Sequence, residues 1–201
     1  MTQARVRRTV EATHKTAAVL VPAQRVWGPI QAIRTRHDRQ VRRWMPHITL
    51  LYPFVTPTEL ARAAERLALV CSRTAPFEVA LRDFGLFEHR SGRCTLWLDP
   101  VPREPVVALQ RALREALPEC AHDGRMSDEF RPHLSVGQAR GRAEAADLRR
   151  VLRAHWQPIR FTVDAVSLLW REDPPDDVFR VDRRVRLGPP SKAAPTRSAG
   201  P

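Results

Sequence analysis

The chain has 201 residues, of which 43% are hydrophobic, so it can form one domain with its own core or two small lobes. Its formal net charge of +12 favours polyanionic partners, namely nucleic acid, nucleotides or an acidic membrane surface. An arginine-rich, lysine-poor composition also arises from a GC-rich genome, so the charge alone identifies no partner. No apolar stretch approaches the roughly 18 residues of a membrane-spanning helix, which excludes that class of protein.

The cysteines Cys71, Cys94 and Cys120 are odd in number and lack CxxC spacing. They therefore argue against a disulfide framework or a structural zinc site, and they fit a reduced, cytoplasmic protein. An apolar run over 17–23 follows several arginines, as in a signal peptide, but it is short, contains Pro22 and precedes a helical pattern. We expect a first β-strand there and no targeting segment.

The first half of the chain predicts five elements after a basic, flexible N-terminus over 1–14. Apolar residues alternate or run together in the strands and recur every three or four positions in the helices. The second helix begins with Thr56 and Pro57, a favourable cap and first-turn pair. The elements are a buried strand (16–21), a helix (24–37), a strand (47–52), a helix (56–72) and a strand (77–87).

The second half repeats this order about 80 residues later, before a Pro-, Ala- and Ser-rich tail over 188–201 that we expect to be disordered. Even "FEV" at the start of strand 77–87 matches "FTV" at 161–163. The expected elements are a strand (94–99), a helix (104–117), a strand (133–137), a helix (142–154), a strand (161–170) and a last strand (178–187).

This repeat predicts an α+β fold over residues 15–187, with duplicated β-α-β-α-β units. The two units should form two pseudo-twofold lobes with antiparallel sheets around a central cleft. The period is too long, and the copies too few, for a solenoid.

A short motif is also written twice: "WMPHITL" over 44–50 and "FRPHLSV" over 130–136. Each is a bulky aromatic, any residue, Pro, His, an aliphatic, a hydroxyl residue and an aliphatic. Side chains alternate along a strand, so the histidine and the hydroxyl residue share one face while the aliphatics pack into the core on the other. One such tetrapeptide is common by chance, whereas two copies at equivalent places in a repeat are specific.

The motifs supply His47 with Thr49, and His133 with Ser135, around one cleft. Such a set suits phosphodiester chemistry, because one imidazole can remove a proton from the attacking oxygen while the other protonates the leaving oxygen. The hydroxyls can donate hydrogen bonds to the non-bridging phosphate oxygens. This chemistry requires neither a metal nor another cofactor.

The stretches "PHITLLYPF" and "RPHLSVGQ" resemble the two signature motifs of the two-histidine phosphoesterases, also called the 2′-5′ RNA ligase or RNA 2′,3′-cyclic phosphodiesterase family. The resemblance covers roughly residues 15–187. It implies a bilobal fold, with both histidines and both hydroxyl residues as the catalytic set. It also implies a metal-independent phosphodiesterase acting on RNA 2′,3′-cyclic phosphate ends or 2′-5′ linked ribonucleotides, with reversible RNA ligation in some members.

Three residues are candidates for substrate binding. Arg131 directly precedes the second Pro-His pair, which makes it the best phosphate ligand. Arg43 closes an arginine cluster over 34–43 that either guides a phosphate backbone or forms a solvated face. Tyr52 follows the first motif, although its parity along the strand places it opposite His47, in the core or at the rim.

Other features near the motifs have weaker assignments. The long polar segment 118–130 precedes the second motif, as a substrate-gating loop would. Phe87, Trp97 and Trp170 could stack a base, but core packing is the more common role for such residues.

The sequence is also compatible with two alternative functions. The chain could be a non-catalytic RNA-binding module that keeps the fold, or a metal hydrolase that uses both motif histidines as ligands. The second lacks H-x-x-x-H or H-x-H spacing and an obvious third ligand. We expect a monomer that binds RNA or a small ribonucleotide and does not associate with membranes.

Overall fold

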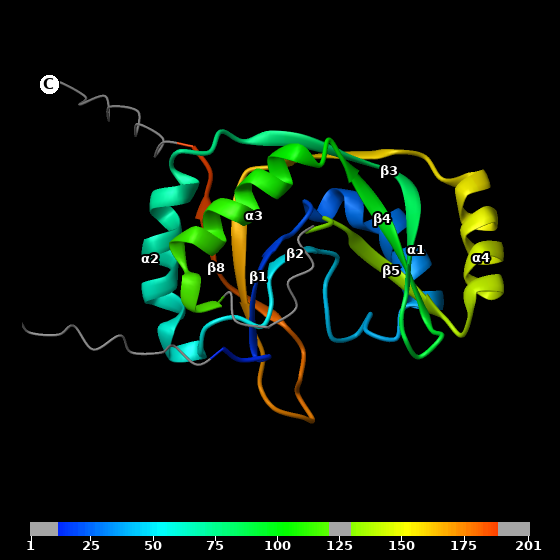
Figure 1. Cartoon of the computed structure of the whole chain (residues 1–201), viewed down its shortest axis with the longest axis horizontal. Helices are drawn as coiled ribbons and strands as arrows, with labels where there is room; N and C mark the ends of the chain where they lie inside the picture. Colours follow the sequence, from blue (N-terminus) through cyan, green and yellow to red (C-terminus); the bar gives the residue numbers. More distant parts are fainter. Residues whose placement is uncertain (1–11, 121–129, 189–201) are drawn as a thin grey trace, which may run out of the picture.

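The computed structural model describes residues 12–120 and 130–188 (Figure 1). Most of the N-terminal segment 1–14, of the gating loop 118–130 and of the C-terminal tail 188–201 lies outside these residues, so the expectations for them stay predictions. The first half contains β1 (Thr16–Leu20), a 3-10 turn (Gln24–Val26) leading into α1 (Trp27–His37), β2 (Ile48–Leu51), a 3-10 turn (Pro57–Glu59) leading into α2 (Leu60–Cys71), and β3 (Phe77–Glu88).

The second half follows the same order as far as its second helix. It contains β4 (Cys94–Val101), α3 (Glu104–Ala116), a 3-10 turn (Pro118–Cys120), β5 (Leu134–Ala139), α4 (Arg142–His155), β6 (Ile159–Val163), β7 (Ala165–Trp170) and β8 (Arg180–Arg186). The helices form where apolar residues recur at three- and four-residue spacing. In α2, for example, this spacing buries Leu60, Ala63, Ala64, Leu67 and Cys71 on one side.

The strands form two four-stranded sheets with the orders β2-β1-β7-β8 and β5-β4-β3-β6. Every strand pair is antiparallel. The predicted α+β class with two antiparallel sheets is therefore confirmed. The two sheets match position by position, and strands cross between the two halves of the chain: β3 of the first half pairs with β4, and β7 of the second half pairs with β1.

The prediction of a single strand over 161–170 is wrong. The chain changes sheets at Asp164, so β6 pairs with β3 whereas β7 lies between β1 and β8. Phe77 pairs with Val163 and Val79 with Phe161, so the matching "FEV" and "FTV" segments are neighbours in one sheet rather than equivalents. The crossing is held because the backbone carbonyl of Asp164 accepts a hydrogen bond from Leu187 N and its carboxylate pairs with Arg184.

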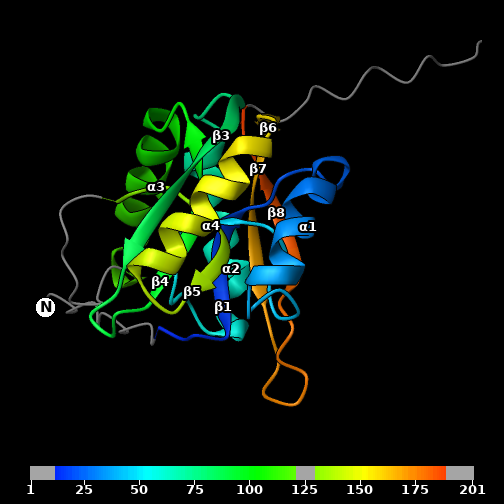
Figure 2. The same ribbon diagram turned by 90° about the vertical axis from the view of Figure 1, so that its right-hand side faces the viewer.

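One main apolar core joins both sheets to the helices. Helix α1 of the first unit packs on β5, α3 of the second unit packs on β2, and α4 packs on β3, β4 and β5 (Figures 1 and 2). Gly137 in β5 permits the close approach of α1, since a Cβ there would lie 2.8 Å from Cβ of His37.

The exchange of helices brings the two motif strands, β2 and β5, into contact with each other, each at the end of its own sheet. Ile48, Leu50, Leu134 and Val136 are buried, as the alternating pattern predicted. Among the described residues, no helix combines the length and apolarity needed to cross a membrane.

Candidate active site

The two motif histidines are held in the same way. Nδ1 of His47 lies 2.8 Å from the carbonyl oxygen of Met45, and Nδ1 of His133 lies 2.9 Å from that of Arg131. A carbonyl oxygen only accepts hydrogen bonds, so Nδ1 must be the protonated nitrogen of each neutral ring. Each Nε2 is therefore the nitrogen that can accept a proton and later donate it.

Aromatic side chains fix the planes of both imidazoles. The ring of His47 stacks on Trp44 with centroids 4.5 Å apart, and Trp44 stacks in turn on Phe179 at 3.6 Å. The rings of His133 and Phe87 form a T-shaped contact with centroids 4.8 Å apart. The bulky aromatic at the start of the first motif thus supports the catalytic candidate, a role that its sequence position alone did not reveal.

A second aromatic residue beside His133, Trp97, is 97% buried and lies 6.1 Å from the imidazole ring. Its indole ring covers Gly85 on the neighbouring strand, and a Cβ at Gly85 would lie only 2.1 Å from Cζ2 of the indole. The absence of a side chain at Gly85 is therefore required for this arrangement. Core packing was predicted for Trp97, and the structure adds its contact with the site.

Thr49 lies on the polar face of β2, opposite Val19 on the neighbouring strand β1. Ser135 lies on the polar face of β5, opposite Trp97 on the neighbouring strand β4. Both are half-buried. Within residues 12–120 and 130–188, neither hydroxyl forms a hydrogen bond with another residue. Both hydroxyls are thus able to donate to a ligand.

Burial lowers the pKa of His47 to about 4. The positive charges of Arg34 and of protonated His133 act in the same direction, while the hydrogen bond to Met45 and the charge of Asp38 oppose them. A positive charge on His133 thus disfavours protonation of His47.

Burial also lowers the pKa of His133, against the opposing effect of its hydrogen bond to the Arg131 carbonyl. Burial therefore favours the neutral form of both rings in the free protein. A bound phosphate anion would favour the protonated form and raise both pKa values.

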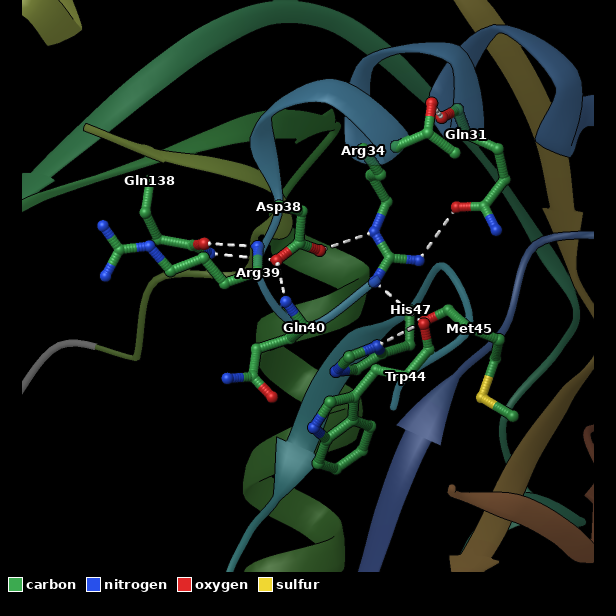
Figure 3. Close-up of polar contacts among 10 residues, drawn as sticks. Gln31, Arg34, Asp38, Arg39, Gln40, Trp44, Met45, His47 and Gln138 are labelled. Carbon is green, nitrogen blue, oxygen red and sulfur yellow. Dashed lines mark hydrogen bonds and ion pairs between the residues drawn. The ribbon is translucent and has the colours of Figure 1, made fainter. Parts of the chain in front are cut away.

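A buried ion pair supports the segment that precedes His47 (Figure 3). Nε of Arg34 donates to Asp38 at 2.8 Å, and both side chains are almost fully buried. The other guanidinium nitrogens of Arg34 donate to the carbonyl oxygen of Trp44 at 2.8 Å and to the side-chain oxygen of Gln31 at 3.0 Å. Arg34 is thus neither a phosphate guide nor a solvated residue, the two interpretations that the sequence left open for the arginine cluster.

The ion pair also connects the two motifs (Figure 3). The side-chain nitrogen of Gln138, in β5, donates to Asp38 at 3.1 Å, and its oxygen accepts from Arg39 N at 2.9 Å. Asp38 also accepts from Gln40 N at 2.9 Å. The segment carrying His47 is therefore tied to the strand carrying His133 and Ser135.

The three predicted substrate-binding residues lie in different surroundings. Arg131 is exposed, with its guanidinium 5.7 Å from the Trp97 ring. Arg43 forms an ion pair with Asp177 at 3.3 Å, so its charge is partly compensated.

Tyr52 follows β2, where the strand alternation has ended, and its ring forms a T-shaped contact with Trp44, with centroids 5.5 Å apart. Tyr52 thus lies beside the aromatic support of His47, whereas strict alternation would have placed it on the opposite side. Among the described residues, no group of three or more His, Cys, Asp or Glu side chains is arranged to hold a metal ion.

Comparisons with known proteins give one consistent result. A family model described as the 2′-5′ RNA ligase superfamily matches residues 22–175. A protein provisionally named as a phosphoesterase, from Geobacillus kaustophilus (strain HTA426), is 29% identical over 158 residues, which cover 78% of this chain and 88% of the relative.

Two solved structures share the fold at low sequence identity. TT0787 of Thermus thermophilus aligns with a TM-score of 0.61 and 19% identity, over 87% of this chain and 98% of that one. E. coli LigT complexed with 3′-AMP aligns with a TM-score of 0.60 and 18% identity over the same shares.

Proposed function

The chain belongs to the 2′-5′ RNA ligase superfamily, and from this premise we propose that it is a metal-independent phosphodiesterase acting on RNA 2′,3′-cyclic phosphate ends or 2′-5′ linked ribonucleotides. The observation that carries the proposal is the matched pair of imidazoles. In both, a backbone carbonyl holds Nδ1 and leaves Nε2 for proton transfer. The description of LigT as a complex with 3′-AMP makes a ribonucleotide ligand a natural choice for this fold.

In the proposed hydrolysis, Nε2 of one neutral imidazole takes a proton from water as its oxygen attacks phosphorus. The bond from phosphorus to the ribose oxygen on the far side breaks, and Nε2–H of the other, protonated imidazole gives its proton to that leaving oxygen. The hydroxyls of Thr49 and Ser135 donate to the non-bridging oxygens, where negative charge builds up. With a ribose hydroxyl in place of water, the same steps reach a 2′-5′ linkage, which is the RNA ligase reaction.

The test is a panel of RNA ending in 2′,3′-cyclic phosphate, 2′,3′-cyclic mononucleotides and 2′-5′ dinucleotides, with end-group determination of the products in the presence of EDTA. We expect turnover of at least one class under chelation. Binding without turnover across the panel would show a non-catalytic RNA-binding module. Activity that is lost with EDTA and restored by zinc or magnesium would show a metal hydrolase.

A further inference from the structure

A groove lies along an open edge of β3, close to the second histidine. Strand β6 pairs with β3 only over residues 77–81, so among the described residues the later part of that edge carries no strand. Two pockets of about 520 and 440 Å³ lie here, and they share Leu86, Ala146 and Arg149. They form one groove between β3 and α4, the helix that runs alongside the sheet in Figure 2.

The groove begins next to the candidate active site. Trp97 and Arg131 both line its first pocket. The Trp97 ring lies 6.1 Å from the His133 ring, and the Arg131 guanidinium lies 5.7 Å from the Trp97 ring. A chain that leaves His133 on this side therefore enters the groove directly.

The groove has an excess of positive charge. The carboxylates in its lining are Asp83, Glu88 and Asp99, each of which pairs with a groove arginine. Twice as many arginines line the two pockets: Arg103, Arg131, Arg142, Arg149, Arg150 and Arg153. Aliphatic side chains of Leu86, Ala146 and Ala154 lie between them. A surface of this kind suits a polyanion that also carries apolar or aromatic groups.

Two buried donors in the groove lack acceptors. Nε1 of Trp97 and Nε of Arg149 are shielded from solvent and have no hydrogen-bond partner. The other unpartnered buried side-chain atoms among the described residues belong to Arg43 and Asp177, which face each other in an ion pair. A buried donor without an acceptor costs about 1–3 kcal/mol, so two in one pocket call for a ligand that brings oxygen acceptors.

We propose that this groove, which we call the β3–α4 groove, binds the ribonucleotide chain that continues from the reacting phosphate. The inference rests on the proposed function for the point where that chain begins. Phosphate oxygens would pair with the arginines, and phosphate, ribose or base oxygens would accept from Trp97 and Arg149. The protein should accordingly bind an oligonucleotide more tightly than a mononucleotide.

The experiment measures binding separately from turnover. Fluorescence anisotropy with a 3′-phosphorylated oligoribonucleotide, which has no cyclic phosphate to open, compares the wild-type protein with the triple variant Arg142→Gln, Arg149→Gln, Arg153→Gln. We expect oligonucleotide affinity to fall about tenfold or more, and the slope of log affinity against log salt to fall by about 0.7 for each phosphate that the variant no longer binds. Turnover of a 2′,3′-cyclic mononucleotide should stay at the wild-type level, because these arginines lie outside the catalytic set.

Arg62→Gln in α2 is the matched control, since its exposed side chain pairs with Glu59 away from the groove and its loss should leave affinity unchanged. Glu88→Gln, which removes the partner of Arg142, should raise oligonucleotide affinity. Wild-type affinity in the triple variant, or losses as large in Arg62→Gln, would overturn the groove whether or not the protein turns over substrate. Groove-dependent binding by a protein without turnover would instead reject the proposed function and keep the groove.

Discussion

Gln138 and Asp38 lie 100 residues apart in the chain, yet the side-chain nitrogen of Gln138 donates to Asp38 at 3.1 Å. The bond joins the strand of the second motif to the segment before the first. The side-chain oxygen of Gln138 also accepts from Arg39 N. Both polar atoms of this side chain therefore bond the segment before the first motif.

Replacing Gln138 with Ala should lower the free energy of unfolding by about 1–3 kcal/mol, since it removes one of the hydrogen bonds to the buried Asp38 carboxylate and leaves Arg39 N without its side-chain acceptor. Urea denaturation of the purified variant measures this. Gln40→Ala is the control, because exposed Gln40 joins the network only through its backbone N–H. Equal losses in the two variants would mean that the Gln138 side chain does not join the halves.

The Arg34–Asp38 pair predicts a non-additive result. Arg34→Met should cost about 3–5 kcal/mol of unfolding free energy, because it leaves the buried Asp38 carboxylate without its counter-charge. The double variant Arg34→Met, Asp38→Leu should lose much less unfolding free energy than the sum of the losses in the two single variants. Denaturation of both single variants and the double variant completes the cycle, and strictly additive losses would contradict a direct buried pair.

The sequence predicted the parts of this site that depend on local periodicity. Alternation alone placed Ile48 and Leu50 in the core, and a two-residue period needs no knowledge of the rest of the fold. The repeat predicted two similar sheets. It did not predict the break at Asp164, because "FTVDAVSLLW" contains a single charged residue and reads as one strand.

The supports of the site could not be predicted from the sequence because they depend on register and on distant partners. Arg34 and Asp38 have the i, i+4 spacing of an ion pair, but local spacing does not show that α1 packs on β5, the strand from which Gln138 reaches Asp38. Likewise, the stacking of Trp44 on Phe179 depends on a distant segment. Phe179 N donates to the carbonyl oxygen of Arg43, and this bond brings the segment before β8 against the first motif.

Replacement by Ala should change the stability of the protein in opposite directions at Gly85 and at Gly28. Gly85→Ala should destabilise the protein by about 1–3 kcal/mol and reduce turnover, since the new Cβ would displace the Trp97 indole that lies beside His133. Gly28→Ala, in the first turn of α1, meets no atom within 4 Å and should stabilise by up to about 1 kcal/mol. Thermal unfolding and turnover of both variants test this, and a stable, fully active Gly85→Ala protein would contradict it.

The lowered pKa of His47 predicts that stability falls in mild acid. Between about pH 6.5 and 4 the unfolded chain binds a proton at this residue that the folded protein does not bind, so the unfolding free energy falls as pH falls through this window. The loss should be on the order of 3 kcal/mol. Urea denaturation at a series of pH values, with wild type and His47→Gln, isolates the effect, and parallel pH profiles would rule out His47 as its source.

The last prediction concerns the pair of histidines. His47→Ala and His133→Ala should each lower turnover by about 10²–10⁴-fold, the usual loss of one general acid or base, while circular dichroism shows a folded protein. The two rings act as a unit, so the double variant should lose far less than the product of the single losses. Thr49→Ala and Ser135→Ala should cost about 1.5–3 kcal/mol of transition-state stabilisation each, as expected for hydrogen bonds to a charged phosphate.

The dependence of kcat/KM on pH tests the same pair without mutation. One imidazole must be neutral and the other protonated in the same turnover, so the profile should be bell-shaped. Both pKa values in the free protein are lowered, which places the maximum below pH 6.5. A folded His133→Ala protein with wild-type turnover would show that the second motif serves structure alone. A rate that does not change with pH in the range where imidazoles titrate would show that the reaction uses other groups.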